Sequence, residues 1–145
     1  MMTIREATLD DSPAIQQLLD QLGYPNLTLE DTRANLKRHQ EPDYRVLVCE
    51  IDEHIVAFIA MHCLHVLHWR KPFGRISSFC VEEGFRSKGV GRQLLHAGEE
   101  WLASQGCVKS EATSNTRRIR AHQFYLSLGY TEDSRRFVKY LRTNE

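Results

Sequence analysis

The segment FCVEEGFRSKGVGRQLL, residues 79–95, decides the fold of this chain of 145 residues. An apolar run ends at Val81, a polar turn follows it, and a basic loop then leads into an amphipathic pattern that begins at Gly89. Helix N-termini carry unpaired backbone N–H groups and positive partial charge, so they bind anions. The segment therefore predicts a buried strand, an anion-binding loop and a helix, in that order.

The residues of this loop suit a phosphate. Gly89 and Gly91 have no Cβ, so a phosphate group can come close to their backbone. Arg86, Lys88 and Arg92 add positive charge that a pyrophosphate or a 3′-phosphate can use. The spacing is neither that of a Walker loop nor that of a dinucleotide fingerprint. A helix start with solvated arginines is the alternative that the spacing alone leaves open.

The rest of the chain predicts strands and helices around this segment. Alternating or apolar runs between turn residues predict strands at Thr3–Thr8, Tyr44–Glu50, Ile55–Leu67, Arg75–Val81, Cys107–Ser114 and Arg136–Leu141. Helical spacing and capping residues, such as Thr28 with Asp31, predict helices at Asp10–Gly23, Thr28–Pro42, Gly89–Gln105 and Arg118–Leu128. The order β-α-α-β-β-β-α-β-α-β implies an α/β fold with a mixed sheet flanked by helices. No linker or repeat divides the chain, so we expect one domain over residues 1–145.

The composition is that of a globular protein with no excess of either charge. Apolar residues make up 41% and charged residues 26%, and the formal net charge is zero. Nucleic-acid binders usually need a basic excess, so we expect no nucleic-acid partner, despite the local cluster Arg117, Arg118 and Arg120. No apolar run is long enough to span a membrane, and no apolar signal core opens the chain. These features predict a cytoplasmic protein without a membrane partner.

The cysteines and histidines do not form a metal-binding pattern. The chain has four cysteines, all inside apolar runs: Cys49, Cys63, Cys80 and Cys107. Such cysteines are typical of small buried hydrophobes in a reducing compartment. Three histidines recur every three residues: His62, His65 and His68. On a strand this spacing puts neighbours on opposite faces, so we expect neither a metal ion nor a disulfide framework.

Three stretches of the sequence together resemble one protein family. Arg86-x-x-Gly89-x-Gly91 after a strand, with Leu94-Leu95 following, resembles the R/Q-x-x-G-x-G/A motif of the GNAT acetyltransferases. Ala121-x-x-Phe124-Tyr125-x-x-x-Gly129-Tyr130 is similar to the pattern of the family's last helix, and Ile4-Arg5-Glu6-Ala7-x-x-x-Asp11 to its first strand and turn. The resemblance implies the GNAT fold, with splayed central strands, and an acetyl-CoA-dependent N-acetyltransferase.

The resemblance also implies where acetyl-CoA binds. The strand ending at Val81 would splay from the strand Cys107–Ser114, and the pantetheine arm would lie in the gap. Backbone groups of Phe79 and Val81 would pair with the pantetheine amides as an added strand does. Backbone N–H groups of the loop would hold the pyrophosphate: Arg86, Ser87, Lys88, Gly89, Val90, Gly91 and Arg92. Many relatives contact the cofactor through an asparagine where this chain has Arg118, and Asn115 is the candidate to replace it.

The mechanism that the resemblance implies is direct transfer. Tyr125 matches the tyrosine that protonates the departing thiolate, and a thiol pKa of ~8.5 and a phenol pKa of ~10 are roughly matched. Glu111 is the favoured candidate for the base that deprotonates the amine, and Glu82 is the other. A packed aromatic for Tyr125 and a solvated charge for either glutamate stay open as alternatives. No histidine neighbours Cys80, so we interpret it as a packed residue rather than a nucleophile.

The expected partner is an amine on a small molecule or a peptide. In relatives, the strand Ile55–Leu67 and the loop after it border the acceptor pocket. One of the histidines, Trp69 and Phe73 are therefore candidates for acceptor contacts, with packing in the core or at its rim as an equal interpretation. Several relatives pair, so a homodimer is a further hypothesis. The alternative function is a non-catalytic coenzyme-A-binding module, which the missing asparagine favours and Tyr125 disfavours.

Overall fold

The computed structural model of the chain describes residues 1–113, 119–133 and 136–143. They belong to two units, Met1–Thr113 and Ser114–Glu145, and each is described by itself. The elements of the first unit are β1 (Met2–Glu6), the 3₁₀ turn η1 (Leu9–Asp11), α1 (Ser12–Leu22), α2 (Leu29–Arg38), β2 (Tyr44–Ile51), β3 (His54–Leu64), β4 (Phe73–Val81), the 3₁₀ turn η2 (Glu83–Phe85), α3 (Val90–Ser104) and β5 (Ser110–Ala112). The second unit contains α4 (Ile119–Ser127).

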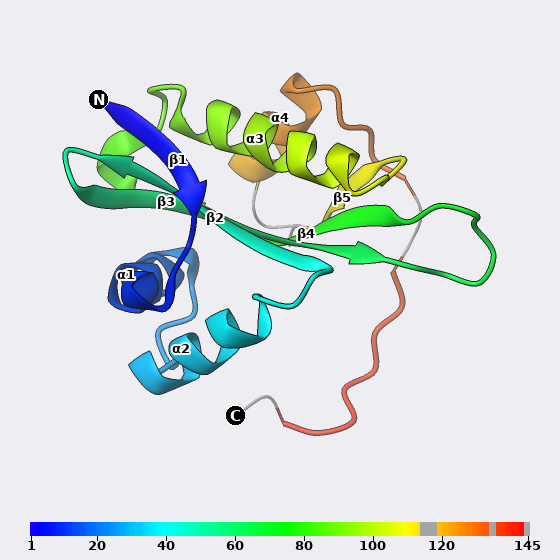
Figure 1. Cartoon of the computed structure of the whole chain (residues 1–145), viewed down its shortest axis with the longest axis horizontal. Coiled ribbons are helices and arrows are strands. Elements are labelled where there is room, and N and C mark those ends of the chain that lie inside the picture. The colour runs from blue at the N-terminus through cyan, green and yellow to red at the C-terminus, as the bar shows by residue number, and fades with distance from the viewer. Residues whose placement is uncertain (114–118, 134–135, 144–145) are drawn as a thin grey trace. The chain divides into compact units, whose positions relative to one another are not determined.

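The strands form one mixed sheet in the order β1-β2-β3-β4-β5. Neighbours from β1 to β4 run antiparallel, whereas β5 runs parallel to β4. The helices α1 and α2 cover one face of the sheet, and α3 covers the other (Figure 1). The predicted mixed sheet flanked by helices is confirmed, while a single domain over residues 1–145 stays a prediction.

One predicted cap and one tight turn define the ends of neighbouring elements. At the start of α2, the Thr28 hydroxyl accepts from the Asp31 N–H and the Asp31 carboxylate accepts from the Thr28 N–H, both at 3.0 Å. This reciprocal capping box satisfies two N–H groups that the helix leaves unpaired. Between β2 and β3, Asp52 and Glu53 have φ angles of 50° and 67°. Positive φ at both central residues is the geometry of a two-residue hairpin turn, which sets the register of the two strands.

Apolar side chains fill both faces of the sheet. On the α1–α2 face, Ile15, Leu18 and Phe58 are buried in one cluster. On the α3 face, the helix lies very close to β3: a Cβ added to Gly98 would be 2.7 Å from the sulfur of Met61. Because the interior is close-packed, such contacts fix how far each helix can move over the sheet.

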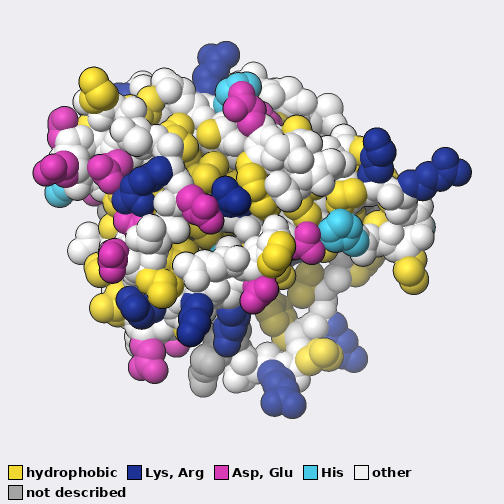
Figure 2. Space-filling view, in the orientation of Figure 1, with side chains coloured by type: hydrophobic (Ala, Val, Ile, Leu, Met, Phe, Trp, Pro, Cys, Tyr) yellow, Lys and Arg dark blue, Asp and Glu magenta, His cyan; other side chains and the backbone are white. Residues whose placement is uncertain are grey.

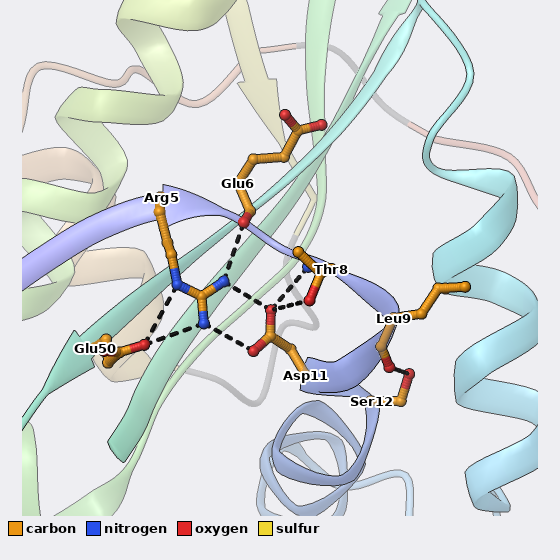
Figure 3. Close-up of polar contacts among 7 residues, drawn as sticks. All are labelled: Arg5, Glu6, Thr8, Leu9, Asp11, Ser12 and Glu50. Carbon is orange, nitrogen blue, oxygen red and sulfur yellow. Dashed lines mark hydrogen bonds and ion pairs between the residues drawn. The ribbon is translucent and has the colours of Figure 1, made fainter. Parts of the chain in front are cut away.

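A charge cluster holds the start of α1 against β1 and β2 (Figure 3). The Arg5 guanidinium donates to both carboxylate oxygens of Asp11 at 2.9 Å and to Oε1 of Glu50 at 3.1 and 3.3 Å. Asp11 also accepts from the Thr8 N–H at 2.8 Å, so it closes the first turn. Burial by itself raises the pKa of Asp11, but the hydrogen bonds from Arg5 and Thr8 outweigh burial, and the pKa lies below its ordinary value.

The predicted last strand, Arg136–Leu141, is wrong. Residues 136–140 are neither helix nor strand, and the side chains of Phe137 and Leu141 are 90% and 88% exposed. Apolar alternation suggested a strand, but a strand also needs a neighbouring edge to pair with. Three other strands have shorter bounds than predicted: β1 ends at Glu6, β3 ends at Leu64 and β5 begins only at Ser110.

The surface carries both signs of charge. Acidic and basic side chains are intermixed over the face shown in Figure 2, as their equal numbers in the sequence suggest. Within the part of the chain that the structure describes, no helix has the length and apolar character needed to cross a membrane.

Candidate active site

The strand β5 pairs with only the first part of β4. Among the described residues they pair only over Gly74–Ile76 and Ser110–Ala112. A β-bulge follows at once at Ser77, where two residues of β4 match one step of β3. The extra residue of a bulge bends its strand and increases the local twist. The pairing of β4 with β5 among the described residues therefore ends at a bulge, and the splay of the two strands stays a prediction.

Beyond the bulge, successive residues of β4 turn their backbone N–H and C=O groups alternately toward β3 and toward the side on which β5 lies. The N–H of Glu82 donates to the Val56 carbonyl at 2.8 Å, so this pair is hydrogen-bonded across the two strands. In an antiparallel ladder the preceding residue, Val81, then turns its own N–H and C=O away from β3. Phe79 lies two residues before Val81, so its N–H and C=O also turn away from β3. These are the two residues predicted to pair with pantetheine.

The loop after β4 leads to a helix start that has no side-chain cap. Ser87 has a φ of 65°, and Gly89, at the N-cap of α3, has a φ of 81°. Left-handed backbone of this kind suits glycine, because a Cβ at such a φ is strained. No side chain accepts a hydrogen bond at this cap. The first N–H groups of α3, Val90 to Arg92, therefore have no carbonyl partner within the helix.

The cations of this loop are exposed, and one of them contacts the end of β4. Arg86 donates from Nε to the Val81 carbonyl at 3.0 Å, a contact with no signal in the sequence. The Nζ of Lys88 lies 5.6 Å from the centroid of the Phe85 ring. Arg92, on the first turn of α3, is exposed. The arrangement presents backbone N–H groups and positive side chains together, which is what an anion requires.

On β5, Glu111 is held by two cations. Arg75, its register partner on β4, donates from Nε and Nη2 to Oε1 of Glu111. The Nζ of Lys109 lies 3.4 Å from Oε2. Because Oε1 already accepts two hydrogen bonds from Arg75, Oε2 is the oxygen with more capacity to accept another. The carboxylate is therefore oriented by its neighbours rather than solvated alone.

Glu111 ends a row of side chains that crosses the sheet on one face. Strand register pairs Tyr44 with His62, His62 with Arg75, and Arg75 with Glu111. The Tyr44 and His62 rings are stacked with centroids 5.3 Å apart. Burial, and then the charge of Arg75, lower the pKa of His62. Its Nδ1 is buried and has no hydrogen-bond partner among the described residues.

Aromatic rings and a lysine border this row. The predicted acceptor residues Trp69 and Phe73 lie with ring centroids 5.9 Å apart, and the Nζ of Lys109 is 4.9 Å from each. Lys109 also contacts Glu111, so the structure brings Trp69, Phe73 and Glu111 into one cluster. Of the other two histidines, His68 is exposed and His65 pairs with Asp43 at 3.2 Å.

In the second unit, the end of α4 positions Tyr125. Gly129 has a φ of 91°, the Tyr130 N–H bonds to the Tyr125 carbonyl at 3.1 Å, and the Gly129 N–H bonds to the Leu126 carbonyl at 3.3 Å. This pair of bonds is a Schellman motif. It brings the Tyr125 and Tyr130 rings to a centroid distance of 5.3 Å, and the Phe124 ring lies 5.6 Å from that of Tyr125. Tyr125 is therefore an aromatic residue held in a defined place on its helix.

Cys80 is the remaining candidate residue that the structure describes. Cys80 is buried, and its thiol donates to the Leu18 carbonyl at 3.3 Å. Asn115, Arg117 and Arg118 lie outside the described residues. Within residues 1–113, 119–133 and 136–143, no three His, Cys, Asp or Glu side chains gather as metal ligands would.

Comparison with known proteins agrees with this geometry. The sequence model of the acetyltransferase (GNAT) family matches residues 12–130. The chain belongs to the GNAT family. Its relatives include the aminoalkylphosphonate N-acetyltransferase of Salmonella typhimurium, 30% identical over 95% of this chain and 90% of that protein. An aminoglycoside N(6′)-acetyltransferase of Stenotrophomonas maltophilia is 30% identical over 97% of this chain and 92% of that one. This GNAT protein is therefore an N-acetyltransferase.

The fold of this GNAT protein matches solved structures along nearly its whole length. An aminoglycoside N-acetyltransferase solved in complex with CoA superimposes with a TM-score of 0.84 over 99% of this chain and 95% of that chain, at 20% identity. The match shows the GNAT fold.

Three features of the site were not predicted from the sequence. They are the Arg75 partner of Glu111, the bulge at Ser77, and the contact of Arg86 with the Val81 carbonyl. The polar pair Ser77-Ser78 inside an apolar strand was a usable signal for the bulge. The two arginine contacts depend on which residues lie across the strands or the turn, and no local pattern marks them.

Proposed function

We propose that this N-acetyltransferase moves the acetyl group of acetyl-CoA directly to an amine of a small molecule or peptide. The orientation of Phe79 and Val81 carries this proposal, because their backbone groups turn to the side of β4 on which β5 lies, beyond the last residue that β5 pairs with. A pantetheine arm that pairs there as an added strand leads its pyrophosphate toward the uncapped start of α3.

The pyrophosphate is held by backbone N–H groups of the loop and the first turn of α3, from Arg86 through Ser87, Lys88, Gly89, Val90 and Gly91 to Arg92. Arg86 uses the Val81 carbonyl in this structure. When a pantetheine amide donates to that carbonyl, the guanidinium is released and can turn to the phosphates. Asn115 is proposed as a further cofactor contact, in place of the asparagine that many relatives have at the position of Arg118.

The proposed chemistry is direct transfer. The amine nitrogen, after losing a proton to Glu111, attacks the thioester carbonyl carbon, and a backbone N–H near Val81 stabilises the oxyanion of the tetrahedral intermediate. The C–S bond then breaks, and Tyr125 gives its phenolic proton to the departing thiolate. Oε2 of Glu111 is the oxygen that accepts the amine proton, since Arg75 occupies Oε1.

Tyr125→Phe and Cys80→Ala test direct transfer. Tyr125→Phe is expected to lower turnover by about 10²–10⁴, the usual effect of losing a general acid, with little change in acetyl-CoA affinity. Cys80→Ala is expected to keep turnover, because its thiol is buried against Leu18. Turnover is measured as thiol release from acetyl-CoA, and affinity by calorimetry.

The reverse pattern, an active Tyr125→Phe and an inactive Cys80→Ala, would replace direct transfer by a ping-pong mechanism. Acetyl-CoA binding without thiol release across every amine class would favour the non-catalytic coenzyme-A-binding module. A homodimer stays a hypothesis, which light scattering checks against the chain mass of 16.9 kDa.

Glu111→Gln and Glu82→Gln form a matched pair that tests the base. Loss of the base is expected to reduce kcat by about 10²-fold or more and to abolish the acidic limb of the pH–rate profile. We expect this result for Glu111→Gln only. If Glu82→Gln shows this result instead, Glu82 is the residue that accepts the amine proton.

For the acceptor, we infer an amine that also carries an anionic group such as a phosphonate. The relative from Salmonella typhimurium is named for such acceptors. At the site, Arg75 and Lys109 supply two positive charges against the single carboxylate of Glu111. The test compares kcat/KM for aminoethylphosphonate, for propylamine and for an aminoglycoside. A preference for the aminoglycoside over aminoethylphosphonate would refute the inference.

A further inference from the structure

Two cysteines that are 44 positions apart in the sequence meet on the α3 face of the sheet. Both are free thiols, and Sγ of Cys107 donates to Sγ of Cys63 at 3.5 Å. We infer that Cys63 and Cys107 are a modification site, a thiol pair that small disulfides or peroxides oxidise to an intramolecular disulfide. Nothing in the acetyl transfer uses either thiol.

The end of α3 brings the two cysteines together. The Cys107 N–H bonds to the Leu102 carbonyl at 3.1 Å, one of the bonds that close the helix after Gly106. Leu102 in turn packs on Gly74, where an added Cβ would lie 2.5 Å from a Leu102 methyl carbon. Gly74 is the register partner of Cys63 on the neighbouring strand. The absence of a side chain on Gly74 therefore lets the end of α3 lie over β3 at the Cys63 thiol.

The surroundings of the two thiols give them different roles. Cys63 is 7% exposed, whereas Cys107 is partly exposed. Burial, and then the hydrogen bond from Cys107, raise the pKa of Cys63 to about 12. Because the thiolate is the nucleophile, Cys107 reacts first with an external oxidant, and Cys63 follows as the resolving thiol.

Each oxidation step balances with a disulfide oxidant such as oxidised glutathione. The Cys107 thiolate attacks one sulfur of the oxidant, a mixed disulfide forms, and one reduced glutathione leaves. Cys63 then loses its proton to solvent and attacks the Cys107 sulfur, and the second glutathione leaves as thiolate. The protein loses two hydrogen atoms, and the oxidant gains them. The sulfur atoms must approach from 3.5 Å to about 2.05 Å, which side-chain rotation and a small shift of the segment after α3 can supply.

The experiment treats the reduced full chain with oxidised glutathione near pH ~8.5, where an ordinary thiol is half ionised. The expected product is lighter by two hydrogen atoms, has a Cys63–Cys107 cross-link on peptide mapping, and returns to the starting mass with dithiothreitol. Thiol titration of the unfolded product is expected to find two of the four cysteines. Closing this long loop is expected to raise Tm by roughly 5–10 °C.

Single variants separate the two thiols. Cys63→Ser is expected to stop at a glutathione adduct on Cys107, and Cys107→Ser to form neither the adduct nor the cross-link. Cys49→Ala keeps the pair and removes a fully buried thiol, so it is expected to cross-link like the parent chain. Four titratable thiols after treatment, a cross-link between other cysteines, or a disulfide between two chains would each overturn the inference.

Discussion

Two strand-to-helix connections in this molecule have the same order of elements and opposite electrostatics. The first runs from β1 through η1 to α1, and the second from β4 through η2 to α3. At the first, Asp11 closes the turn, and its charge is matched by the Arg5 guanidinium. At the second, Gly89 is the N-cap without a side-chain bond, and the nearby cations are exposed. Neither helix N-cap has a side-chain bond to its helix, so the difference is that a carboxylate, Asp11, stands at the first N-cap and Gly89 at the second.

The difference separates a structural helix start from a binding helix start. Each helix leaves its first N–H groups without carbonyl partners. At the first site the N-cap residue is Asp11, whose carboxylate bonds to Thr8 and Arg5 rather than to N–H groups of α1 but places a negative charge at the helix start, where an anionic ligand is then disfavoured. At the second site the same groups remain for a phosphate. Charged residues near a helix start therefore indicate binding only where no chain carboxylate has already taken the site.

The largest expected effect is from Gly89→Asp, which gives the second connection an anion of its own. A carboxylate at the N-cap competes with the pyrophosphate for the N–H groups and repels it. We expect acetyl-CoA affinity to fall by about 10²-fold or more, the equivalent of two lost charge-assisted hydrogen bonds. Calorimetry on the folded variant measures this change.

Gly23→Asp is the matched control for that substitution. Gly23 also has positive φ, 117° against 81° for Gly89, and an added Cβ has nothing within 4 Å at either position. Both variants therefore bear a similar backbone strain of about 1–3 kcal/mol. Only Gly89→Asp is expected to lose acetyl-CoA affinity, and equal losses in the two variants would mean that strain, not charge, is responsible.

A smaller effect is expected from Asp11→Ala, which removes the anion of the first connection. The variant loses the carboxylate that closes the first turn and leaves Arg5 with Glu50 and the Glu6 carbonyl, so we expect the free energy of unfolding to fall by about 1–3 kcal/mol. Urea denaturation measures this change. Acetyl-CoA affinity is expected to stay the same. A loss of affinity comparable with that of Gly89→Asp would contradict the proposal that only the start of α3 binds the cofactor.

The smallest expected effect is on the pH dependence of stability. The pKa of Asp11 in the folded chain lies below its ordinary value of 3.8. A lowered folded pKa means that the stabilisation is fully present above the unfolded pKa and is lost as the pH falls through the folded pKa. Asp11→Asn should therefore flatten the decline in stability below pH 3.8 and leave the slope at neutral pH unchanged. Parallel acid unfolding curves for the two proteins would contradict this.

Much of the fold and part of the site could be predicted from the sequence because they depend on residues that are close together in it. The capping box of Thr28 and Asp31 involves residues three positions apart, and the glycines and cations of the phosphate loop all lie in one short segment, from Arg86 to Arg92. Helix starts, turns and apolar periodicity depend on neighbours of this kind. The same local logic failed at Arg136–Leu141, where alternation was present but strand pairing was not.

By itself, then, the sequence determined the order of helices and strands, the basic loop before α3 and the resemblance to GNAT proteins. Only the tertiary structure decided that Ser77 is a bulge, that Arg75 orients Glu111, and that Cys63 meets Cys107. Each of these depends on register between strands or on where a helix ends over the sheet. A one-residue slip of a strand reverses every side chain, so such contacts are set only when the whole sheet and its helices pack together.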